Sequence, residues 1–196
     1  MTPEETAAAL EDLLGQPVQD LRRLTGGASR ETWAFRAGDE RYVLQRERPG
    51  APRPGAMGLE ADLLRAAAEG GVPVAPLVAG AGADERFGGV GFLVSHFVDA
   101  ETIARKIQRD DTYAAARERF AADCGRALAA IHAIPASSVP ELTGADPMEQ
   151  YRQMLDGYGD PIPAFELAFR WLEANRPAST GETVVHGDFR LGNLMV

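Results

Sequence analysis

The chain has 196 residues, of which 45% are hydrophobic and 25% charged, the composition of a globular protein that can bury a core. Its net charge of −9 argues against non-specific binding to nucleic acid or to anionic membranes. A single cysteine, Cys124, excludes an internal disulfide framework, and no window approaches the run of about 20 apolar residues that a membrane helix needs, so we expect a cytoplasmic protein.

The first half of the chain predicts a mostly antiparallel sheet with one inserted helix. Thr2-Pro3-Glu4-Glu5 reads as a capping box at the start of a helix that ends at Gly15. Residues 18–48 have strand character and contain a hairpin turn at Gly38-Asp39. A helix is expected after the Pro/Gly-rich stretch 49–58.

The pattern then changes from strands to helices. Two strand-like runs between Val72 and Val98 complete the sheet, and apolar residues at helical spacing predict a helix over 113–133. A further helix closes near Asn175, and a short strand at 183–185 leads into the final loop. We therefore predict a β-rich lobe over 1–98 and a helical lobe over 99–196.

The final loop contains the most specific pattern in the chain. In His186-Gly187-Asp188-Phe189-Arg190-Leu191-Gly192-Asn193, an Asp precedes an Asn by five positions, the catalytic-loop spacing of kinase-type phosphotransferases. Asp188 is the expected catalytic base, Asn193 the expected magnesium ligand, Arg190 a cation near the transferred phosphate, and His186 a brace for the loop. A polar turn without chemistry is the alternative.

Two further segments are candidate nucleotide contacts. Gly26, Gly27 and Ser29 lie between two predicted strands, where backbone N–H groups could approach phosphate oxygens. A plain turn is the alternative for this segment. Backbone groups of Ser95 and Phe97, at the end of a predicted strand, are expected to pair with the adenine edge, an inference from position alone.

A kinase-type site also needs a cation for the α- and β-phosphates, held by an acid on the inserted helix. Glu60, expected in the first turn of that helix, is either this acid or a favourable charge at a helix N-terminus. The expected cation position is occupied by Gln45, and Arg46 falls on the opposite face unless the strand is bulged.

These residues resemble the aminoglycoside phosphotransferase-like kinase family, in particular the branch similar to kinase domains associated with acyl-CoA dehydrogenases. The similarity spans essentially the whole chain, and Gly187 in place of the protein-kinase Arg is typical of small-molecule kinases. The motifs that carry it are Leu24-Thr25-Gly26-Gly27-Ala28-Ser29, Arg41-Tyr42-Val43-Leu44, Gly71-Val72-Pro73-Val74, Phe97-Val98-Asp99, Trp171-Leu172-Glu173-Ala174-Asn175 and the loop at 186–193.

The resemblance implies an α+β, protein-kinase-like two-lobed fold that uses ATP and Mg²⁺ to phosphorylate a hydroxyl of a small molecule. In such a fold, residues 1–98 are the nucleotide-binding lobe and residues 99–196 are a partial helical lobe that ends in the catalytic loop. The resemblance also implies a metal-binding Asp after the final loop, so we expect the chain to be a fragment of a longer kinase. A hydroxylated acyl compound or other metabolite is favoured as acceptor over an aminoglycoside. Acids in an expected loop around 146–160, namely Asp146, Glu149, Asp156 and Asp160, could attract a cationic antibiotic. Gln45 keeps a nucleotide-binding pseudokinase or scaffold open as the alternative.

Overall fold

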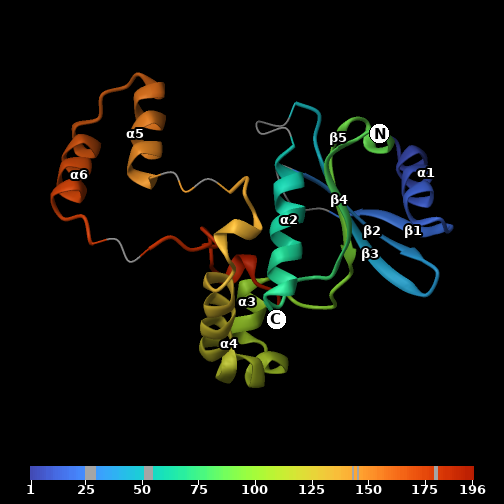
Figure 1. Cartoon of the computed structure of the whole chain (residues 1–196). Helices are drawn as coiled ribbons and strands as arrows, with labels where there is room; N and C mark the ends of the chain where they lie inside the picture. The colour runs from blue at the N-terminus through green and yellow to red at the C-terminus, as the bar shows by residue number, and fades with distance from the viewer. Residues whose placement is uncertain (25–29, 51–54, 143, 145, 179–180) are drawn as a thin grey trace.

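The computed structural model describes residues 1–24, 30–50, 55–142, 144, 146–178 and 181–196. Figure 1 shows a β-sheet with helices α1 and α2 on either side of it, and a helical part that contains α3 to α6. The strands are β1 (Val18–Leu24), β2 (Arg30–Ala37), β3 (Glu40–Glu47), β4 (Leu77–Asp84) and β5 (Val90–His96). The helices are α1 (Pro3–Leu14), α2 (Ala56–Glu69), α3 (Ala104–Arg109), α4 (Ala114–His132), α5 (Pro147–Tyr158) and α6 (Pro163–Ala174).

All neighbouring strands of the sheet run antiparallel, in the order β1-β2-β3-β5-β4. The hairpin of β2 and β3 turns at Gly38-Asp39 as predicted, and Gly38 has a φ of 59°, which suits glycine. The α+β class with an antiparallel sheet is therefore confirmed.

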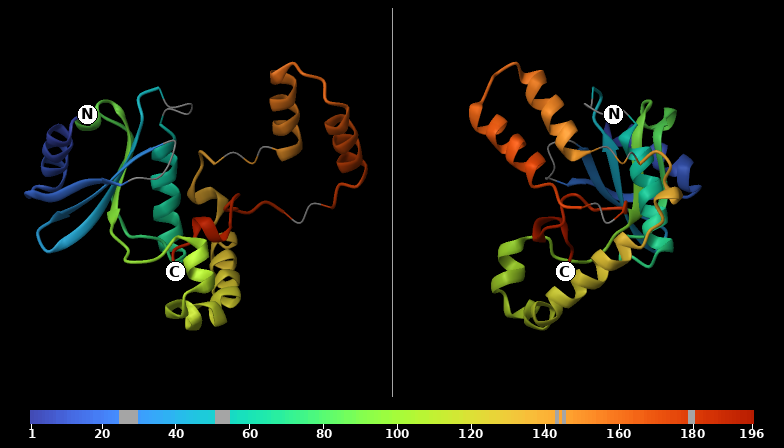
Figure 2. Two further views of the ribbon diagram at one scale, coloured as in Figure 1. Left: turned by 180° about the vertical axis from the view of Figure 1, so that it is seen from behind. Right: turned by 60° about the vertical axis from the view of Figure 1, so that its left-hand side comes forward.

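The two faces of the sheet are covered by different helices (Figures 1 and 2). On one face, Ala9 and Leu10 of α1 pack with an apolar set that includes Leu44, Phe92 and Val94. On the other face, α2 packs against Leu93 of β5. Because side chains alternate along a strand, consecutive residues of β3 and β5 belong to opposite faces.

Helix α2 lies unusually close to the sheet because glycines line the contact. A Cβ added at Gly58 would come within 2.9 Å of the backbone nitrogen of Gly82 in β4. The beginning of the helix is also fixed by Glu47 at the end of β3. Its carboxylate is buried and accepts backbone N–H bonds from Gly55 and Met57 at 3.2 Å and from Gly91 of β5 at 3.3 Å.

A second apolar cluster joins the end of α2 to the helical part. Ala66 and Ala67 of α2 pack with Ile131 and Ile134 at the end of α4 and with Val184, just before the final loop. The predicted lobe boundary at 98–99 falls in the segment between β5 and α3, and it stays a prediction. The same segment pairs with the final residue, since the backbones of Glu101 and Val196 exchange two hydrogen bonds of 2.8 and 3.0 Å.

Helices α5 and α6 form a pair that stands apart from α2 and α4 in both figures. The expected helix before Asn175 is confirmed as α6. The expectation of a loop around 146–160 is wrong, because α5 occupies 147–158. Asp146 caps α5 by accepting the Met148 N–H at 3.0 Å, and Pro147 is its first residue, so the Asp-Pro pair was the available signal.

Two other expectations need correction. Residues 183–185 are not part of a strand, and the Thr183 hydroxyl donates to the His132 carbonyl. Glu60 is not in the first turn of its helix, because α2 already begins at Ala56. Within the described residues, no helix has both the length and the apolar character needed to cross a membrane.

Glu47→Ala should destabilise the fold by about 2–4 kcal/mol, because it leaves three buried N–H groups without their shared acceptor. Urea unfolding would measure the loss. Glu69→Ala, which removes an exposed acid at the other end of α2, should change the stability by less than about 0.5 kcal/mol. Equal stabilities of the two variants would contradict the role assigned to Glu47.

Candidate active site at the Asp188 loop

The loop at residues 186–193, here called the Asp188 loop, is anchored by one apolar side chain before it and one within it. Val184, directly before it, is 5% exposed and packs into the cluster shared by α2 and α4. Phe189 packs partly against the same cluster, and its ring meets the edge of His186 at 5.4 Å between centroids. Gly187 has a φ of 79°, a conformation that residues with a Cβ rarely adopt. The apolar side chains thus fix a loop whose polar side chains remain exposed.

Asp188 is the centre of the polar contacts in this loop. The Asn193 side-chain amide donates to Asp188 Oδ2 at 2.7 Å and to the Asp188 carbonyl at 2.9 Å. Arg190 Nε donates to both carboxylate oxygens at 3.1 and 3.2 Å. The Asp188 N–H in turn donates to His186 Nδ1 at 3.3 Å. The structure therefore brings together all four residues that the spacing selected.

These contacts favour the ionised form of the Asp188 carboxyl. The hydrogen bond from Asn193, followed by that from Arg190, lowers the pKa of Asp188 below its ordinary value. The side chain is 64% exposed, so solvent and a substrate can both reach it. An ionised, accessible carboxylate is the form required to orient a hydroxyl and accept its proton.

The donor set around Asp188 fits a magnesium ion that arrives with a nucleotide. Asn193 presents its nitrogen to Asp188, so the amide oxygen is at the opposite end of the same group. Among the described residues, no group of three or more His, Cys, Asp or Glu side chains could hold a metal by itself. Magnesium sites in kinases are of this shared kind, built from one or two protein oxygens and the phosphates.

The structure shows how Gln45 and Arg46, the two candidate phosphate contacts on β3, are oriented. Strand β3 pairs without a bulge to both β2 and β5, so Gln45 and Arg46 lie on opposite faces. Arg46 is 3% exposed, and it donates from Nε to the Phe87 carbonyl and from a terminal nitrogen to Glu31, each at 2.8 Å. Arg46 is therefore a buried part of the core on the α1 side of the sheet.

Glu60 of α2 does have a cationic partner, but it comes from β2. Arg30 forms a bidentate pair with Glu60, with distances of 2.8 and 2.5 Å between nitrogens and carboxylate oxygens. The hydrogen bonds to Glu60 raise the pKa of Arg30, although burial opposes this. Because Glu60 lies beyond the first turn of α2, this ion pair accounts for it better than a helix-end charge does.

Arg30 is a partner of Glu60 that the sequence interpretation missed. The signal was present in the hairpin, because a two-residue turn at 38–39 pairs Ala37 with Glu40. Counting outward from that pair places Arg30 on the same face as Gln45. Within the described residues, no hydrogen bond or ion pair joins Arg30 or Glu60 to the Asp188 loop.

The other predicted nucleotide contacts lie either outside the described residues or at the end of β5. Gly26, Gly27 and Ser29 lie outside the described residues. Ser95 is inside the sheet, between Val43 of β3 and Leu77 of β4. The Phe97 N–H already donates to the Arg41 carbonyl at 2.8 Å, so only the carbonyl of Phe97 is left to meet a base edge.

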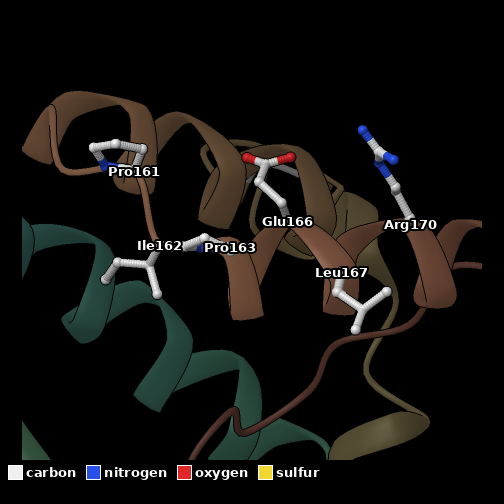
Figure 3. Close-up of a pocket in the computed structure, with 6 residues that line it drawn as sticks. All are labelled: Pro161, Ile162, Pro163, Glu166, Leu167 and Arg170. Carbon is white, nitrogen blue, oxygen red and sulfur yellow. The ribbon is translucent and has the colours of Figure 1, made fainter.

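A shallow hollow of about 320 Å³ lies on α6 and is distinct from the Asp188 loop. Figure 3 shows Ile162 and Leu167 pointing to one side and Glu166 and Arg170 to the other. Glu166 is engaged by Arg152 of α5 at 3.3 Å. The hollow brings together none of the predicted site residues, so we assign it no chemistry.

Asn193→Ala should raise the pKa of Asp188, because it removes the largest interaction that stabilises the ionised carboxyl. Any contribution of ionised Asp188 to stability is present above the ordinary aspartate pKa and disappears as pH falls through the lower folded value. Carbon-13 NMR of the carboxyl would show a titration midpoint at higher pH. Asn175→Ala, at the end of α6, is the control and should leave the midpoint unchanged, and an unchanged midpoint in Asn193→Ala would contradict the assignment.

Known proteins share both the sequence pattern and the fold. Residues 20–196 match the model of the phosphotransferase enzyme family. The chain is 26% identical over 187 residues to acyl-CoA dehydrogenase family member 10 of Mus musculus, an alignment that covers 90% of the chain and 17% of the mouse protein.

Two solved structures extend the likeness to the fold. One is a protein of Ralstonia eutropha described as a candidate aminoglycoside phosphotransferase, with a TM-score of 0.73, 23% identity, and coverage of 96% of this chain and 60% of that one. The other is a spectinomycin phosphotransferase in complex with ADP and spectinomycin, with a TM-score of 0.62, 14% identity, and coverage of 97% and 65%. The chain thus spans less than two thirds of each of these three proteins, and its sheet and helices have the kinase-like fold of the two structures. It belongs to the phosphotransferase enzyme family.

Proposed function

We propose that the protein transfers the γ-phosphate of ATP to a hydroxyl group of a small molecule, with Asp188 as the catalytic base. The observation that carries this proposal is the exposed Asp188 carboxylate, held by Asn193 and Arg190 within the part of the chain that matches the phosphotransferase family. The spectinomycin phosphotransferase of similar fold was solved with ADP, which supports an adenine nucleotide as the donor.

Asp188 acts on the acceptor in this proposal. Its carboxylate accepts a hydrogen bond from the acceptor hydroxyl and orients the oxygen toward the γ-phosphorus. The new O–P bond forms as the bond from the γ-phosphorus to the β,γ-bridging oxygen breaks, ADP leaves, and the hydroxyl proton passes to Asp188. Because the transition state is loose, orientation contributes more than early proton removal.

The other residues of the Asp188 loop serve this carboxylate. Asn193 and Arg190 keep it ionised and fix its direction, and His186 holds the backbone by accepting the Asp188 N–H. The Asn193 oxygen would hold Mg²⁺, which neutralises charge on the phosphates when bound. The Arg190 side chain is 65% exposed, so its positive charge can interact with the phosphate that is transferred.

The acceptor in this proposal is a hydroxylated acyl compound or another metabolite rather than a cationic aminoglycoside. Two of the acids around 146–160 that could attract an antibiotic have partners in the fold, Asp146 and Glu149. Asp146 caps α5 and pairs with Arg176 at 2.5 Å, and the bond to Arg176 lowers the pKa of Asp146. Glu149 accepts a bond from Gln153. The resemblance to the acyl-CoA dehydrogenase-associated branch supports the same preference.

Asp188→Asn should reduce phosphoryl transfer by about 10²–10⁴-fold, because the amide cannot accept the proton, while MgATP affinity changes only a few-fold. Transfer of labelled γ-phosphate to hydroxylated acyl compounds and aminoglycosides would measure the rate, and calorimetry the affinity. Asp39→Asn, in the β2–β3 turn, is the matched control and should leave both values unchanged.

The same experiment separates the enzyme from the alternative motivated by Gln45, a nucleotide-binding protein without catalysis. MgATP binding with no transfer to any acceptor or to water would favour that alternative. Full transfer by Asp188→Asn would show that another group is the base.

A further inference from the structure

Arg30 and Gln45 lie on the same face of the sheet. Gln45 is opposite Thr32 in the β2–β3 pairing, and Arg30 is two residues from Thr32, so Arg30 and Gln45 are diagonal neighbours. Such neighbours are about 7–8 Å apart, within the reach of a long side chain. Gln45 is also opposite Leu93 of β5, which packs against α2, so this face is the one that α2 covers.

Glu60 fixes the Arg30 guanidinium on this face without using all of its donors. The bidentate pair engages both terminal nitrogens of Arg30, each of which carries two hydrogens. A guanidinium has five N–H donors, so further donors stay available to an anion. The side chains of Arg30 and Glu60 are 32% and 34% exposed, which leaves the pair accessible from solvent.

We propose that Arg30 supplies the cation that contacts the nucleotide phosphates, in place of the β3 cation that this chain lacks at Gln45. The proposal rests on the proposed function and extends it to one specific contact. Glu60 is a positioning residue here, because it orients the guanidinium and touches no substrate. The acid–cation pair of a kinase is thus kept, while its cation has moved from β3 to β2.

The cation next to Gln45 in the chain cannot take the same role. Arg46, next to Gln45, lies on the opposite face and is enclosed by the Phe87 carbonyl and Glu31. Arg30 is also suited to the task, because a planar guanidinium can bind a carboxylate and a phosphate at once through different N–H groups.

The test compares binding of MgATP with binding of adenosine, which lacks phosphates, in the wild type and in Arg30→Gln. We expect MgATP to bind about 10–100-fold more weakly to Arg30→Gln, as for the loss of a charge-assisted bond, while adenosine binds equally. Arg30→Lys, which keeps the charge without the fork, should show a smaller loss. Arg23→Gln is the matched control, because Arg23 is a cation of β1 on the opposite face, and it should bind MgATP like the wild type.

A rescue variant distinguishes a phosphate contact from a structural ion pair. Adding Gln45→Lys to Arg30→Gln returns a cation to the diagonal position, and we expect it to recover most of the lost MgATP affinity. Melting temperatures measured alongside identify any variant whose fold is weakened.

Three results would overturn the proposal. They are wild-type MgATP affinity in Arg30→Gln, an equal loss of adenosine and MgATP affinity, and a stably folded double variant without recovery. If the wild type transfers phosphate while Arg30→Gln binds MgATP normally, only this inference fails. If the wild type binds no MgATP, the proposed function fails with it.

Discussion

Helix α2 is held to the rest of the protein at three points along its length, and both halves of the candidate site depend on this. At its beginning, the buried Glu47 carboxylate binds the backbone of Gly55 and Met57. One turn later, Glu60 reaches Arg30 of β2. At its end, Ala66 and Ala67 pack into the cluster that also buries Val184. The helix therefore connects the ion pair on the sheet to the Asp188 loop through packed side chains and buried hydrogen bonds.

The Asp188 loop was predictable from the sequence because its geometry is local. Asp188 and Asn193 are close in the chain, and a tight loop of that length returns one side chain to the other, as their 2.7 Å hydrogen bond shows. The hairpin at Gly38-Asp39 and the first helix were predictable for the same reason, since turn and capping residues act within a few positions.

The residues that escaped prediction depend on contacts between distant segments. Arg30 is thirty positions from Glu60, the predicted acid with which it pairs, and Arg30 has no sequence signature of its own. Gln45 suggested a site without a cation because the prediction used the side-chain alternation of β3 alone. It did not include the pairing of β3 with β2, which places Arg30 on the same face. Glu47 also has no sequence signature, yet it is buried against backbone N–H groups at the start of α2 and in β5. Helix α5 was missed although Asp146-Pro147 marks its start, and none of its residues is buried in the core.

The central claim is that a nucleotide places its phosphates between the Arg30–Glu60 pair and the Asp188 loop. A crystal structure of the protein with Mg²⁺ and a non-hydrolysable ATP analogue tests it most directly. The account predicts that an Arg30 nitrogen contacts an α- or β-phosphate oxygen and that the Asn193 oxygen ligates the metal. Phosphates bound away from β2, or a metal held without Asn193, would contradict it.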